Sequence, residues 1–100
     1  MIKHIVMWKL REYAEDALKA ENALRMKQIL DELPAKIPEI RRLEVGIDSG
    51  GNEGSYDIVL SADFDSAEDL DRYQEHDAHM KAAEFIQKIR ENRASVDYEV

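Results

Sequence analysis

The first segment of the chain, Ile2–Leu10, is apolar on both faces of an extended strand. Val6 and Trp8 occupy one face, and Ile5 and Met7 occupy the other. A strand that is apolar on both sides is covered on both sides, and therefore lies centrally in a sheet. The rest of the chain, or a second copy of it, has to supply both covers.

The spacing of apolar residues after this strand alternates between two periods. A period near 3.6 predicts a helix over Glu15–Leu33, which ends at Pro34 because proline cannot continue the hydrogen-bond ladder. Alternation with a period of two predicts strands over Arg42–Asp48, Tyr56–Phe64 and Ser95–Val100. The glycine-rich loop between the first two of these lacks the lysine and spacing of a phosphate-binding loop, and we expect a hairpin connection.

A second helical region lies between the last two predicted strands. Ser66–Asp69 resembles a capping box, with Ser66 as the N-cap and an acidic residue three positions later. Apolar spacing predicts a helix from this cap, a break at His76-Asp77 and a second helical stretch through Ile89.

The resulting order is β-α-β-β-α-β, in one domain spanning residues 1–100. This order predicts an α+β protomer of ferredoxin-like fold, with an antiparallel four-stranded sheet and both helical layers on one face. The opposite face, with Ile5, Met7 and Val59, has no element of this chain to cover it. Exposed apolar sheet faces are association sites, so we expect a homodimer packed sheet to sheet.

Charge and composition narrow the possible partners. The chain has 22 acidic and 14 basic residues, a net charge of -8 and no continuous basic stripe. Such a surface repels phosphates, which disfavours binding to nucleic acid and to anionic membranes. The absence of cysteine excludes disulfides and thiolate chemistry. The first residues lack the features of a signal peptide, and we expect a cytoplasmic protein.

The three histidines are the candidate functional residues. His4 shares a strand face with Trp8, on the side predicted to face the helices, while Tyr73, His76 and His79 are spaced by three. A histidine in such a cleft can transfer protons at neutral pH, and a tyrosine can donate to a developing oxyanion. Alternatively, His4 is a satisfied core histidine, Tyr73 a packing residue and Trp8 a core anchor.

Metal binding has weak support in the sequence. His76 and His79 have an H-x-x-H spacing, but the H-E-x-x-H pattern is absent and there is no thiolate ligand. We therefore predict no metal ion and no cofactor.

Five segments together resemble the stress-responsive dimeric α/β-barrel (Dabb) proteins. The most specific is Tyr73–His79, which is similar to a Y-x-x-H-P-x-H pattern with Asp77 in place of the usual proline. The others are the opening strand Ile2–Leu10, Val45–Asp48, Tyr56–Leu60 followed by Phe64–Ser66, and Val96–Tyr98. The resemblance implies ferredoxin-like protomers whose sheets pack into a dimeric α/β barrel. Most relatives have no established biochemical role.

The resemblance also implies possible roles for the site residues. A few plant relatives are polyketide cyclases that close a ring by aldol chemistry, and their working Tyr and His correspond to Tyr73 and His79. His4 and His76 correspond to other polar residues around that pocket. A monooxygenase on a similar barrel would rest on fold analogy alone.

Three functional hypotheses follow. The first is a dimer that binds a small apolar molecule in a sheet-helix pocket, with Trp8 and His76 contacting the ligand. The second is a cyclase- or isomerase-like enzyme with His79 as base, Tyr73 as oxyanion donor and His4 as an orienting group. The third is a purely structural, stress-protective oligomer.

Overall fold

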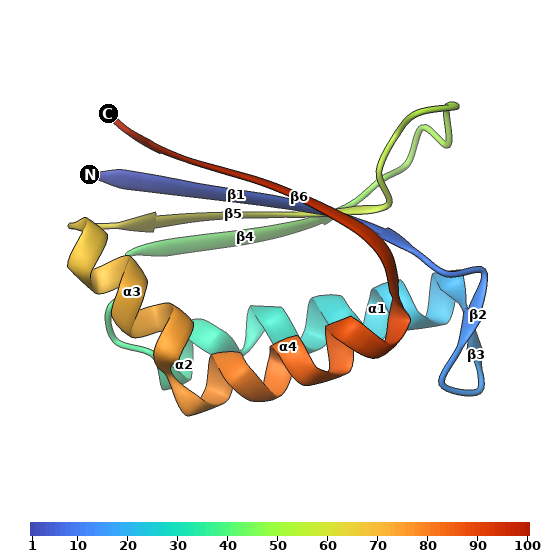
Figure 1. Cartoon of the computed structure of the whole chain (residues 1–100), viewed down its shortest axis with the longest axis horizontal. Helices are drawn as coiled ribbons and strands as arrows, with labels where there is room; N and C mark the ends of the chain where they lie inside the picture. The colour runs from blue at the N-terminus through green and yellow to red at the C-terminus, as the bar shows by residue number, and fades with distance from the viewer.

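The computed structural model describes residues 1–100 as an antiparallel sheet with helices on one of its faces (Figure 1). The sheet has four strands in the order β4-β5-β1-β6, so the doubly apolar strand β1 is central, as predicted. This arrangement and the chain order of its elements confirm the predicted α+β class. The strands are β1 (Ile2–Leu10), β4 (Arg42–Ile47), β5 (Ile58–Phe64) and β6 (Arg90–Glu99).

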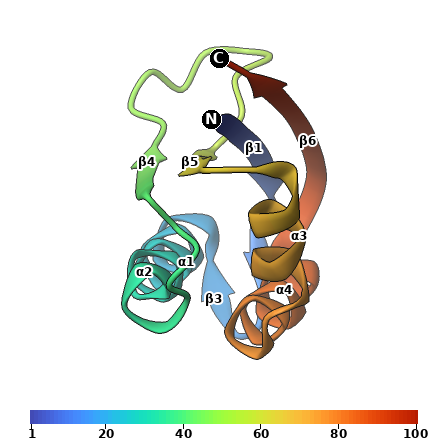
Figure 2. The ribbon, with the colours of Figure 1, turned by 90° about the vertical axis from the view of Figure 1, so that its left-hand side faces the viewer.

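The helices form a single layer beneath the sheet. Figure 2 shows α1 and α2 under the β4 side, and α3 and α4 under the β6 side. The core lies between the layers, where Val6, Leu60 and Met26 are almost fully buried. None of the helices has the length and apolar character needed to span a bilayer. The helices are α1 (Lys19–Asp31), α2 (Leu33–Lys36), α3 (Ala67–Glu75) and α4 (Asp77–Ile89).

A small hairpin replaces the predicted start of the first helix. Strands β2 (Tyr13–Ala14) and β3 (Ala17–Leu18) are joined by Glu15 and Asp16, whose φ angles of 50° and 59° lie in the left-handed region. Asn22, which is buried at the start of α1, donates to the carbonyls of Ala14 and Ala17 and fixes the hairpin. The prediction of helix from Glu15 was therefore wrong by four residues.

Other boundaries also differ from the predicted ones. The connector after α1 contains the short helix α2, in which Pro34 lies in the first turn, where its missing N–H is not needed. Strand β5 begins at Ile58 rather than Tyr56, and β6 begins at Arg90 rather than Ser95. The longer β6 lets it pair with β1 along nearly its whole length.

The predicted cap and helix break are both present. The Ser66 hydroxyl accepts a hydrogen bond from the Asp69 amide at the start of α3. His76 has an extended backbone between α3 and α4, and its Nδ1 accepts from the Ala78 amide at 3.0 Å. The chain therefore changes direction at His76, so that α3 and α4 are two distinct helices with different axes (Figure 1).

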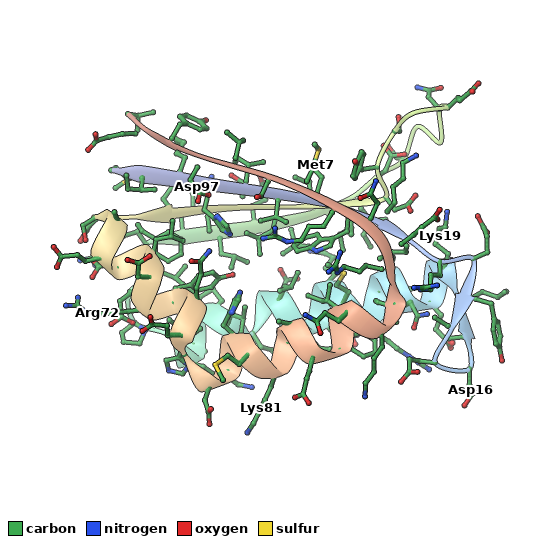
Figure 3. All side chains as sticks on the ribbon, viewed as in Figure 1. Met7, Asp16, Lys19, Arg72, Lys81 and Asp97 are labelled. Carbon is green, nitrogen blue, oxygen red and sulfur yellow. The ribbon has the colours of Figure 1, made fainter.

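The sheet face opposite the helices has no cover within the chain. The register of β1 with β5 and β6 places Ile5, Met7, Val59 and Val96 on this face. Met7 points away from the helices in Figure 3 and is 39% exposed, and Val96 is 55% exposed. The predicted uncovered apolar face is confirmed.

Candidate functional site

A cavity of about 280 Å³ lies between the sheet and helices α3 and α4. Its walls come mainly from β1, α4 and the start of β6, with single residues from α1, β5 and α3, and most of its lining residues are apolar. The polar side chains around it are His4, Tyr73, His79, Gln87, Arg90 and Arg93.

Tyr73 contributes a protonated hydroxyl to this cavity. It is 1% exposed, and its ring packs against Phe64 with the centroids 4.9 Å apart. Burial raises the pKa of the Tyr73 hydroxyl well above its usual value of 10.0, so the group stays protonated at neutral pH. No side chain or carbonyl of the chain forms a hydrogen bond with this hydroxyl, which is free to donate to a ligand.

His79 lies against Tyr73, with their ring centroids 4.6 Å apart. Its Nδ1 is 3.1 Å from the carbonyl oxygen of Gln74. Because a carbonyl only accepts hydrogen bonds, Nδ1 carries the proton and Nε2 keeps a free lone pair. Burial lowers the pKa of His79 from 6.5. The hydrogen bond to the Gln74 carbonyl opposes this shift, whereas His4 and Arg93 add to it, so the ring is a neutral base near pH 7.

His4 forms the third polar group of the site and is paired with a carboxylate. It is 3% exposed, and its Nδ1 is hydrogen-bonded to Oδ1 of Asp97, its cross-strand neighbour on β6. A carboxylate only accepts hydrogen bonds, so His4 Nδ1 is the donor in this contact. The His4 ring lies 6.0 Å from that of Tyr73, in an edge-to-face arrangement.

The structure brings together four of the five predicted site residues. His4, Trp8, Tyr73 and His79 all line the cavity. His76 does not, because its imidazole is used to cap α4. The predicted contact between His76 and a ligand has no support in this arrangement.

Three functional candidates were missed by sequence reasoning. Asp97 is hydrogen-bonded to His4, and Arg90 and Arg93 line the cavity. The sequence signal for Arg93 and Asp97 is the alternation of side chains along β6, which places both on one face of the strand. There they are the cross-strand neighbours of Trp8 and His4. Only the β1–β6 register reveals that this face is the one above the cavity.

The positive charge of Arg93 acts on both central residues of the site. It lowers the pKa of Tyr73 and that of His79, although burial has the larger effect on each group. The Arg93 side chain lines the same cavity as the two rings, so its charge would also act on a ligand held against them. The chain has no group of three or more His, Asp or Glu side chains placed to bind a metal ion.

The chain matches a family model across nearly its full length. The model describes the stress responsive A/B barrel domain, and the match covers residues 2–100. The chain belongs to this family. The match agrees with the resemblance noted in the Tyr73–His79 segment.

Solved structures similar to this stress responsive A/B barrel chain include two dimeric proteins of unknown function with a ferredoxin-like fold. One, from Bacteroides fragilis, has 37% sequence identity and a TM-score of 0.83 over 99% of this chain and 95% of that chain. The other, from Thermobifida fusca, has 28% identity and a TM-score of 0.85 over 99% and 90% of the two chains.

A more distant structure of the same fold is an enzyme. The hydroxynitrile lyase from Passiflora edulis has 16% identity and a TM-score of 0.80, over 99% of this chain and 92% of that chain. At this identity the likeness concerns the fold alone. Comparison with curated proteins gave no match.

Proposed function

We propose that this protein binds a small, largely apolar carbonyl compound in the cavity and removes a proton from the carbon beside the carbonyl group. One observation carries the proposal. Tyr73, a protonated donor without a partner in the chain, lies against His79, a neutral base whose Nε2 is free. Paired groups whose environments hold one protonated and the other unprotonated are typical of acid-base sites.

The proposed reaction divides the work between the two rings. The C–H bond breaks, its proton goes to Nε2 of His79, and the electron pair moves toward the carbonyl oxygen. Tyr73 donates a hydrogen bond to that oxygen as it becomes negative. The enolate then takes the proton back at another atom, which is an isomerisation. Alternatively, it attacks a second carbonyl carbon and forms a C–C bond, as in an aldol ring closure, and the resulting alkoxide takes the proton from His79.

Each group should contribute a measurable share of the rate. General base catalysis is typically worth about 10²–10⁴-fold, and one oxyanion donor about 10²–10³-fold. In this proposal His4 is a positioning residue that acts through its hydrogen bond to Asp97 and its contact with Tyr73. Trp8 and the apolar residues of α4 exclude water from the reacting atoms.

We also propose that the protein is a homodimer associated through the open face of its sheet. The similar proteins from Bacteroides fragilis and Thermobifida fusca are dimeric, and this chain has the same fold and an uncovered apolar face. Burying Met7 and Val96 against a second copy would remove that apolar surface from water.

Proton exchange in D₂O tests the catalytic proposal. A panel of aryl ketones and β-dicarbonyl compounds is incubated with the protein, and loss of the α-proton signal is followed by NMR. We expect wild-type protein to accelerate exchange for at least one class, and His79→Ala to lose at least about 100-fold of that rate.

Lys81 provides the matched control. It lies on the same helix, and its side chain points away from the sheet in Figure 3. Lys81→Ala should keep the wild-type rate. Equal exchange rates for wild type and His79→Ala, with the fold intact in both, would mean that the cavity binds ligands without this chemistry, or that the histidine only packs.

A further inference from the structure

The polar lining of the cavity differs in charge from the rest of the molecule. The chain as a whole has 22 acidic and 14 basic residues. The cavity is lined by two arginines, Arg90 and Arg93, and by no Asp or Glu side chain. The carboxylate of Asp97 is hydrogen-bonded to His4, one of the lining residues. A cavity with this lining attracts negative charge although the protein as a whole repels it.

Arg90 and Arg93 have no ion-pair partner within the chain. By contrast, Arg41 pairs with Asp65 at 2.6 Å, and Arg42 and Arg72 also bind carboxylates. The only hydrogen bond that the Arg93 guanidinium group donates within the chain is to the Ser95 hydroxyl, at 3.5 Å. In a chain with an excess of acidic residues, these two cations remain available to a ligand.

We propose that the ligand of this cavity carries a carboxylate, which Arg93 and Arg90 bind while its apolar part lies against Trp8 and α4. This inference rests on the proposed function in that it names the substrate class of the same cavity. A guanidinium group binds a carboxylate through two parallel hydrogen bonds, which fixes orientation as well as charge.

The position of Arg93 places such a carboxylate beside the reacting groups. Arg93 is the cross-strand partner of Trp8 on the helix-facing side of the sheet. Its charge also acts on both Tyr73 and His79. A carboxylate held by Arg93 would therefore leave the neighbouring part of the ligand near both rings.

The size of the cavity limits the ligand further. Its volume of about 280 Å³ lies just below the usual range for ligand pockets, about 300–1,000 Å³. We expect a carboxylic acid built on a single aromatic ring or a short aliphatic chain. The bound carboxylate would offset part of the positive charge that the two arginines bring to a largely apolar cavity.

Paired probes test this inference by binding alone. The affinities of benzoate and octanoate are measured by calorimetry at low salt and compared with those of benzamide and octanamide. We expect at least one carboxylate to bind about 10- to 100-fold more tightly than its amide, as a charge-assisted pair predicts. This preference should weaken as salt is added.

Variants of the arginines identify the residues responsible. Arg93→Gln and the double variant Arg90→Gln/Arg93→Gln should bring the affinity ratio of carboxylate to amide close to one. Because neither arginine has an ion pair in the chain, both variants should fold, which circular dichroism can check. Lys88→Gln removes an exposed charge of α4 outside the cavity and should leave the ratio unchanged.

The inference is overturned if the amides bind as tightly as the carboxylates, if none of the four probes binds, or if the ratio survives in the double variant. Its failure is separate from failure of the proposed chemistry. Carboxylate binding that depends on Arg93, together with unchanged exchange in His79→Ala, would refute only the chemistry. Lost exchange in His79→Ala, together with equal binding of acids and amides, would refute only the arginine site.

Discussion

Replacing Tyr73 with phenylalanine removes one oxygen atom from the cavity, and we expect it to affect catalysis and stability very differently. The Tyr73 ring packs between Phe64 and His79, with centroid distances of 4.9 and 4.6 Å, and phenylalanine keeps both contacts. The hydroxyl has no hydrogen-bond partner in the chain, so its loss leaves no buried group unsatisfied.

The magnitudes follow from these contacts. A typical hydrogen bond contributes about 0.5–1.5 kcal/mol, and this hydroxyl forms none within the protein. We therefore expect the free energy of unfolding of Tyr73→Phe to stay within about 1 kcal/mol of wild type. For a domain of this size that limits the change in Tm to about 4–8 °C. Loss of an oxyanion donor should lower the rate of α-proton exchange by about 10²–10³-fold.

Thermal unfolding and α-proton exchange, measured on the same preparations, test both expectations. Tyr13→Phe is the matched control, because Tyr13 is exposed in the β2–β3 hairpin and lies outside the cavity. A loss of more than about 2 kcal/mol in stability with an unchanged exchange rate would refute the reasoning, because the hydroxyl would then be a structural group.

Three further predictions concern residues whose positions are fixed by the structure. Burial lowers the pKa of His79 below its unfolded value of 6.5. The folded protein therefore holds the neutral ring more strongly than the unfolded chain does, and its free energy of unfolding should decrease as the pH falls below 6.5. In urea denaturation, the free energy of unfolding should fall with decreasing pH more steeply for wild type than for His79→Gln, by up to about 1.4 kcal/mol per pH unit. Parallel pH dependences for the two proteins would contradict this. His76→Ala should cost about 1 kcal/mol in urea denaturation because the Ala78 amide loses its acceptor, whereas His76→Asn should restore the cap. We expect His76→Ala and His76→Asn to bind ligand as tightly as wild type does. Weaker binding by both variants would mean that His76 contacts the ligand. Met7→Lys and Val59→Lys place a charge on the open sheet face and should yield monomers in light scattering, whereas dimers of unchanged mass would locate the interface elsewhere.

The fold could be predicted from the sequence because its main signals are local and periodic. Alternating apolar residues identified the strands, and Ser66 marked the start of α3. The β2–β3 hairpin was missed because its turn needs positive φ at two residues, for which Asn-Gly is the usual signal. Here the turn residues are Glu15 and Asp16, which fit the start of a helix equally well by composition.

The site could be predicted only where its residues lie close in sequence. Tyr73 and His79 are six positions apart, and their spacing placed them together. Asp97 lies 93 positions from its partner His4, and its role depends on the β1–β6 register. Arg93 is brought to the cavity by the same register. His76 fits the spacing of the site, but its imidazole is used by the backbone of α4.

The most direct test of the central claim is the protonation state of His79 in solution. NMR of the protein labelled with ¹⁵N-histidine reports which ring nitrogen carries the proton. At neutral pH we predict a neutral His79 ring, with the proton on Nδ1 facing the Gln74 carbonyl and Nε2 unprotonated. An imidazolium ion, or a neutral ring with its proton on Nε2, would contradict the account, because His79 would then have no free base to offer a ligand.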